Sequence, residues 1–89
     1  MQSYKFIVTG RVQGVYYRVN VVKNAKTAYL SGYVKNLADG SVEACVTCEE
    51  EQLEVFRNIL KKGSPNSRVS NLKETPISRV FSGLFEVRT

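Results

Sequence analysis

Apolar and polar residues alternate in some stretches of this chain and recur every three or four positions in others. Alternation is typical of a strand with one buried side, and the longer spacing is typical of a helix with one buried face. Strands are predicted at 4–9, 30–36, 41–47 and 84–88, with a weaker one at 67–77. Helices are predicted at 18–29 and 49–62.

Each predicted helix has its own apolar stripe. In the first helix the stripe is Val19, Val22, Ala25 and Tyr29. In the second helix it is Leu53, Phe56, Ile59 and Leu60. These stripes are expected to pack against the sheet, because an amphipathic helix buries its apolar face.

The ends of the second helix follow from charge and turn residues. Thr47 or Cys48 is the expected N-cap, and the acidic run 49–51 at the start and the lysines at 61–62 both suit the helix dipole. Gly63 is expected to end this helix. Farther back, Asp39 and Gly40 predict a tight hairpin between the second and third strands.

The order of elements is strand, helix, strand, strand, helix, strand. This order predicts a single α+β domain spanning residues 1–89, a ferredoxin-like two-layer sandwich. Its antiparallel sheet would have four or five strands, with both helices on one face. Pro76 places the weak strand at an edge, since proline cannot donate to a central ladder.

Composition narrows the possible chemistry. The net charge of +5 favours an anionic partner but does not separate a phosphorylated metabolite from nucleic acid. The chain has no histidine, which excludes histidine-based triads and metal sites. No apolar run is long enough for a membrane span and no leader pattern opens the chain, so a cytoplasmic protein is expected.

The two cysteines form a C-x-x-C pair, Cys45 and Cys48, which could serve redox chemistry or metal binding. Against this, Cys45 alternates with apolar residues and is expected on the outer face of a strand. Two thiols alone also leave a zinc site half complete. Free thiols without a function are therefore the favoured interpretation.

The stretch from Gly10 to Arg18 joins the first strand to the first helix. Its two glycines, Gly10 and Gly14, permit tight bends that turn consecutive N–H groups toward one point. A helix N-terminus follows, and Arg18 adds a fork of donors suited to phosphate or carboxylate. The loop indicates an anion site, although turn glycines and a solvated arginine would look the same.

Two motifs extend this interpretation to a family. Gly10-Arg-Val-Gln-Gly-Val-Tyr-Tyr-Arg18 and Gly32-Tyr-Val-Lys-Asn36, with Asp39-Gly-Ser-Val-Glu43 beyond them, resemble the acylphosphatase family over nearly the whole chain. The resemblance implies hydrolysis of acyl phosphates to a carboxylate and inorganic phosphate, with no metal, no cofactor and no covalent intermediate. A monomer is expected, with acyl phosphate or inorganic phosphate as its only partner.

The resemblance also assigns roles to residues. Arg18 and Asn36 take the catalytic roles, Arg18 holding the phosphoryl group and Asn36 positioning the attacking water. The substrate-binding residues are Gln13, Gly14, Val15, Tyr16, Tyr17 and Arg18, mainly through their amides. From the residues alone, Asn36 could instead cap the hairpin, and the Gln13 side chain could simply brace the loop.

Three positions depart from the family pattern. Tyr17 replaces the usual phenylalanine and Tyr33 the usual tryptophan, so each adds a hydroxyl that needs a partner if buried. Leu37 follows Asn36 where some members have threonine, which would leave Asn36 less constrained.

Two other classes of function compete with hydrolysis. An RNA-binding sheet would need aromatic residues on the outer face of its central strands, and 41–47 has none. A metal-delivery domain would need its thiols in the loop before the first helix, and they are elsewhere.

Overall fold

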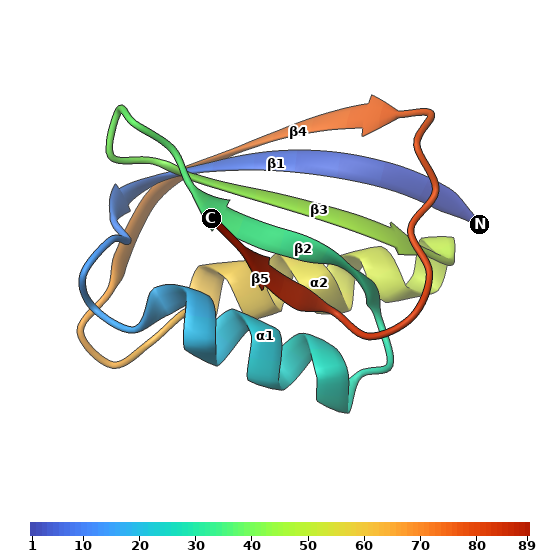
Figure 1. Cartoon of the computed structure of the whole chain (residues 1–89), viewed down its shortest axis with the longest axis horizontal. Helices are drawn as coiled ribbons and strands as arrows, with labels where there is room; N and C mark the ends of the chain where they lie inside the picture. Colours follow the sequence, from blue (N-terminus) through green and yellow to red (C-terminus); the bar gives the residue numbers. More distant parts are fainter.

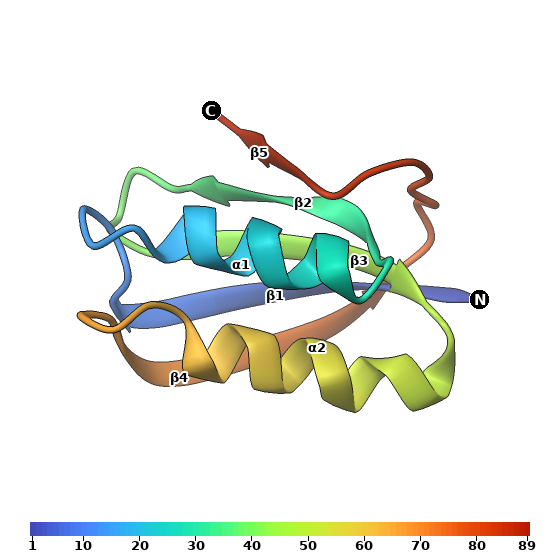
Figure 2. The same ribbon diagram turned by 90° about the horizontal axis from the view of Figure 1, so that it is seen from below.

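The computed structural model describes all 89 residues as one five-stranded sheet with two helices. Both helices lie on the same side of the sheet, next to each other (Figures 1 and 2). In chain order the elements are β1 Gln2–Arg11, α1 Tyr17–Thr27, β2 Ser31–Asn36, β3 Val42–Cys48, α2 Glu50–Lys62, β4 Arg68–Ile77 and β5 Glu86–Arg88. The ferredoxin-like arrangement is confirmed.

The strand order in the sheet is β4-β1-β3-β2-β5. The first four of these strands pair antiparallel, as expected, but β5 pairs parallel with β2. The sheet is therefore mixed, and the prediction of a purely antiparallel sheet was wrong at this edge. The connection after β4 runs past the ends of the strands to the other edge of the sheet, so β5 begins at the end where β2 begins and runs in the same direction (Figure 1). β4 is the opposite edge and contains Pro76, as predicted.

The core lies between the sheet and the helices. From α2 it receives Leu53, Phe56, Ile59 and Leu60, so the predicted stripe of the second helix is confirmed. Three phenylalanines meet there: Phe56 lies 5.5 Å from Phe6 and 5.7 Å from Phe85, measured between ring centroids.

The predicted stripe of α1 is partly wrong. The buried residues are Tyr17, Val21 and Ala25, whereas Val19 is 60% exposed and Tyr29 is 92% exposed. Residues spaced by four keep one face toward the sheet, and Val19 is out of phase with that face. Tyr29 lies beyond the C-cap, with a φ of 59°, so the helical spacing no longer applies to it.

The N-cap of α2 is Glu49, not Thr47 or Cys48. Both of those residues still belong to β3. The Thr47 hydroxyl is also engaged elsewhere, 2.6 Å from the Ser3 hydroxyl and accepting from the N–H of Phe81 at 2.8 Å. At the other end, Gly63 is the C-cap, as expected.

Neither helix has the length and apolarity that a membrane-spanning helix requires.

Candidate active site

Sheet topology brings the loop after β1 and the end of β2 to the same edge. β1 and β2 are each antiparallel to β3, so they run in the same direction and end together. β5 is parallel to β2 and also ends there. The sequence-distant Arg18, Asn36 and Arg88 are therefore brought to one end of the molecule.

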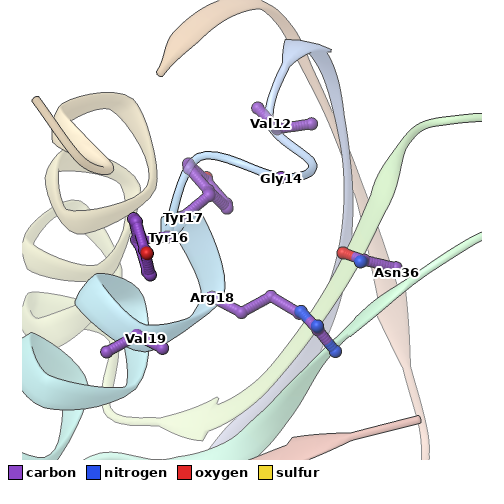
Figure 3. Close-up of a pocket in the computed structure, with 7 residues that line it drawn as sticks. All are labelled: Val12, Gly14, Tyr16, Tyr17, Arg18, Val19 and Asn36. Atoms are coloured by element: carbon purple, nitrogen blue, oxygen red, sulfur yellow. The ribbon is translucent and has the colours of Figure 1, made fainter. Parts of the chain in front are cut away.

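Arg18 and Asn36 line a cavity of about 350 Å³ at this end. Its lining residues are Val12, Gly14, Tyr16, Tyr17, Arg18, Val19 and Asn36. Figure 3 shows the guanidinium of Arg18 extending from α1 toward Asn36 on β2, below the loop that contains Gly14. The two residues to which the resemblance gave catalytic roles thus face one space.

The loop presents a row of unpaired N–H groups. No backbone N–H from Gln13 to Tyr16 donates a hydrogen bond within the chain. The next two, on Tyr17 and Arg18, belong to the first turn of α1, where a helix provides no acceptors for its own N–H groups. The N-cap residue Tyr16 gives no side-chain cap, and the first turn contains no acid. Such a helix start favours an anion.

Glycine is needed in this loop for two different reasons. Gly14 has a φ of 71°, in the left-handed region, and a Cβ there would meet nothing within 4 Å. Gly10 has a φ of 127° at a register shift of β1, and a Cβ there would clash with the carbonyl oxygen of Arg68. Gly14 therefore shapes the loop, and Gly10 allows β4 to approach it closely.

Arg18 has no carboxylate partner among the ion pairs of the structure. Its one hydrogen bond within the chain is long, from Nη1 to the backbone carbonyl of Arg88 at 3.4 Å. Most of its donors therefore point into the cavity without an acceptor, which suits a guanidinium that takes a phosphoryl group.

Asn36 is the last residue of β2, and its Oδ1 is buried without any hydrogen-bond donor. The alternative role of capping the hairpin does not fit, because the turn is held by other groups. The N–H of Leu37 donates to the Ser41 carbonyl at 2.9 Å, and Asp39 Oδ1 accepts from the Ser41 N–H at 2.9 Å. Hydrogen bonds from Ser41 also hold the pKa of Asp39 below its usual value. A buried unpaired oxygen is costly, so Asn36 Oδ1 calls for a partner from outside the chain.

The Gln13 side chain braces the loop against the β2–β3 hairpin. Its Nε2 donates to the carbonyls of Leu37 and Ser41, each at 2.8 Å. Because Leu37 directly follows Asn36, this clamp fixes Asn36 relative to the loop. The bracing alternative for the Gln13 side chain is thus confirmed, while its backbone N–H remains free.

The other side of the loop is held by the end of α2. Ser64 Oγ donates to the Val15 carbonyl at 2.6 Å, and Tyr17 Oη donates to the Leu60 carbonyl at 2.7 Å. The sequence analysis did not single out Ser64, and no local signal reveals a contact across 49 positions. The hydroxyl that Tyr17 adds to the family pattern has its partner, and burial raises the pKa of Tyr17.

The two cysteines lie on opposite faces of the sheet. Cys48 belongs to the core under the sheet, whereas Cys45 points to the opposite face, where it neighbours Tyr33. Both thiols are free and buried, and burial raises the pKa of each. A disulfide or a shared metal between them would require a side chain to cross the sheet.

The outer face of the sheet is poorly suited to stacking bases. Its aromatic residues are Tyr33 and Phe81, and Arg88 lies 4.2 Å from the Tyr33 ring centroid while Arg79 lies 5.2 Å from that of Phe81. Tyr33 is only 8% exposed, and its hydroxyl donates to Glu43 at 2.5 Å. Since RNA-binding sheets stack bases on open aromatic rings, the RNA-binding alternative is not favoured.

Comparison with known proteins gives a consistent result. The family model described as Acylphosphatase matches residues 4–86. An acylphosphatase of Actinobacillus pleuropneumoniae is 46% identical over 74 residues, which cover 83% of this chain and 82% of that protein. One of Methanocella arvoryzae is 36% identical over 88 residues, covering 99% and 100% of the two chains. The crystal structure of acylphosphatase from Bacillus subtilis superposes with a TM-score of 0.90 at 40% identity and covers 100% of both chains.

Proposed function

Since the chain belongs to the acylphosphatase family, we propose that it hydrolyses acyl phosphates with its own loop amides, Arg18 and Asn36 as the working groups. The reaction cleaves the bond between phosphorus and the bridging oxygen of the carboxyl–phosphate anhydride. Its products are a carboxylate and inorganic phosphate.

The phosphoryl group is bound by the loop and the start of α1. The free N–H groups from Gln13 to Arg18 donate to its peripheral oxygens, and the Arg18 guanidinium donates from the side of the cavity. Charge in a loose phosphoryl-transfer transition state is spread over these oxygens, so fixed donors around them lower the barrier.

The attacking water is oriented by Asn36. Its unpaired Oδ1 accepts a hydrogen bond from the water, which directs a lone pair of the water oxygen toward phosphorus. An amide is too weak a base to remove the proton, so Asn36 acts by positioning alone. As the new P–O bond forms, one proton of the water passes to a phosphate oxygen and the other stays on the attacking oxygen.

The leaving group needs little help. A carboxylic acid has a pKa of about 4 to 5, by analogy with side-chain carboxyls. The carboxylate can therefore depart with the bond electrons and without protonation. This property suits a chain that contains no histidine to serve as a general acid.

The unpaired Oδ1 of Asn36, facing Arg18 across the cavity, is the observation that carries the proposal. The test is hydrolysis of benzoyl phosphate by the wild type and by Arg18→Ala, each with and without a metal chelator. We expect the turnover of the wild type to be the same with and without the chelator. In Arg18→Ala turnover should fall by about 10³-fold or more, as for arginines that stabilise phosphoryl transfer. Arg79→Ala is the matched control because it removes the same charge from the far face of the sheet.

A monomeric, cytoplasmic enzyme whose only partner is a small phosphorylated molecule remains our prediction. Sedimentation of the purified protein with and without inorganic phosphate would test the monomer.

A further inference from the structure

The cavity has an apolar part that the phosphoryl site does not use. Of its lining residues, Val12 and Tyr17 are each 1% exposed and belong to the core. Tyr16 and Val19 differ from them: they are 77% and 60% exposed and neither packs against the core. We call these two side chains the apolar rim. Other large apolar side chains are exposed elsewhere in the chain, but Tyr16 and Val19 are the exposed ones that line the cavity.

The backbone conformation of Tyr16 is unfavourable for tyrosine, so the choice of this residue type calls for an explanation. Its φ of 62° and ψ of 24° lie in the left-handed region, which costs about 1 kcal/mol or more for a residue with a Cβ. Glycine or asparagine would adopt this conformation more easily, as Gly14 does two residues earlier. Strain of this kind at the edge of a site points to a use for the side chain.

The position of the rim agrees with the direction of the reaction. In Figure 3, Tyr16 and Val19 lie on the opposite side of the first turn of α1 from Asn36. Attacking and leaving oxygens are roughly in line in phosphoryl transfer. If water is held at Asn36, the departing carboxylate and its acyl group leave toward the side where the rim lies.

The charges around the cavity limit what the acyl group can be. Arg18 is the only charged residue in the lining. In the proposed reaction its guanidinium binds the phosphoryl group, so no charged side chain of the lining is left to bind the acyl group. From the rim, the strain and the reaction direction, we infer that the site prefers acyl phosphates whose acyl group is uncharged and aromatic or bulky aliphatic, bound against Tyr16 and Val19. This inference rests on the proposed function.

The test compares benzoyl phosphate with acetyl phosphate, which has the same reacting bond but almost no apolar surface. In Tyr16→Asn and in Val19→Ser we expect kcat/KM for benzoyl phosphate to fall by about three- to tenfold, the size of one aromatic contact. For acetyl phosphate kcat/KM should change less than twofold in Val19→Ser. In Tyr16→Asn, whose position belongs to the phosphoryl-binding loop, the loss for acetyl phosphate should be smaller than the loss for benzoyl phosphate. Inhibition by inorganic phosphate should stay as in the wild type in Val19→Ser, because Val19 lies outside the loop that binds the phosphoryl group. Tyr16→Asn keeps its amide and a residue that tolerates the left-handed conformation, so the loop should keep its shape.

The chain offers close controls. Tyr29 is also exposed and left-handed, with a φ of 59°, but lies beyond the other end of α1, and Val55 is a half-exposed valine on α2. Tyr29→Asn and Val55→Ser should leave both substrates unaffected. An equal loss for both substrates in the rim variants, or no loss for either, would overturn the inference. Absence of turnover by the wild type on both substrates would instead overturn the proposed function.

Discussion

The two helices begin in opposite ways. At α2, the N–H of Glu49 donates to Gln52 Oε1 at 3.0 Å, and Glu50 and Glu51 place negative charge in the first turn. At α1, the N-cap Tyr16 is left-handed and provides no side-chain cap, and no acid follows it. One helix start is closed by its own residues, whereas the other is left open.

This contrast separates stability from function within one small fold. A capped, acid-bearing start stabilises its helix, because it satisfies N–H groups and the positive end of the dipole. The start of α1 lacks that stabilisation, and its unpaired donors are what the proposed phosphoryl site requires. Stability at this end comes instead from clamps on either side of the loop, by Gln13 and Ser64.

After Arg18→Ala, the largest effect on this arrangement is expected from Asn36→Ala. It removes the group that orients water across from the open helix start, so kcat should fall by about 100-fold or more. Inhibition by inorganic phosphate should persist. The free energy of unfolding should not decrease, because the lost Oδ1 has no partner within the chain.

Steady-state kinetics and urea unfolding of Asn36→Ala measure both quantities, with the exposed strand residue Asn71 changed to alanine as the control. Full activity in Asn36→Ala would remove Asn36 from the mechanism.

A smaller effect is expected when the clamp is released. Gln13→Ala and Gln13→Glu both lose the two donations to the hairpin carbonyls, so both should lower kcat by about tenfold through misplacement of Asn36. Each hydrogen bond contributes about 0.5–1.5 kcal/mol, so unfolding should also become easier. Phosphate inhibition should change less than kcat. If Gln13→Glu behaved like the wild type, the clamp would have no role in positioning.

An acidic residue in the first turn of α1 should stabilise the protein and weaken its binding of phosphate. Val19→Glu places an acid in the first turn of α1, which should raise the free energy of unfolding by about 0.3–1 kcal/mol. The same charge repels phosphate, so inhibition by phosphate should weaken by about fivefold, which corresponds to about 1 kcal/mol at the partly screened surface. Val19→Gln is the control, because glutamine has nearly the shape of glutamate but no charge. Unchanged phosphate inhibition in Val19→Glu would mean that the anion binds elsewhere.

The smallest effect on activity is expected at the closed helix start. Gln52→Ala removes the acceptor for the N–H of Glu49 and should destabilise the protein by about 0.5–1 kcal/mol. Turnover of benzoyl phosphate should be unaffected at temperatures well below unfolding. A loss of activity in the folded variant would show that the two helix starts are not independent.

The sequence predicted what local patterns encode. Its alternation and spacing predicted the strands and the buried face of α2. The motifs also singled out Arg18 and Asn36, which line one cavity in the structure. It misplaced the buried face of α1, because valines at 19, 21 and 22 allow more than one helical phase. It also misjudged the pairing of β5, which was expected in an antiparallel sheet and pairs parallel with β2.

The long-range hydrogen bonds that hold the site could not be predicted from the sequence. The Arg88 carbonyl reaches Arg18 across 70 positions and Ser64 reaches Val15 across 49. Contacts of this kind depend on how the sheet orders its strands, so they have no signature in a local stretch of sequence.

The central claim is that the open start of α1 and the loop before it bind the phosphoryl group. A titration of the wild type with inorganic phosphate, followed through the backbone amide resonances by NMR, tests it most directly. We expect the amides from Gln13 to Arg18 to shift with the concentration dependence that phosphate shows as an inhibitor, while those at the start of α2 stay in place. Shifts confined to other residues, or none at inhibitory concentrations, would contradict the claim.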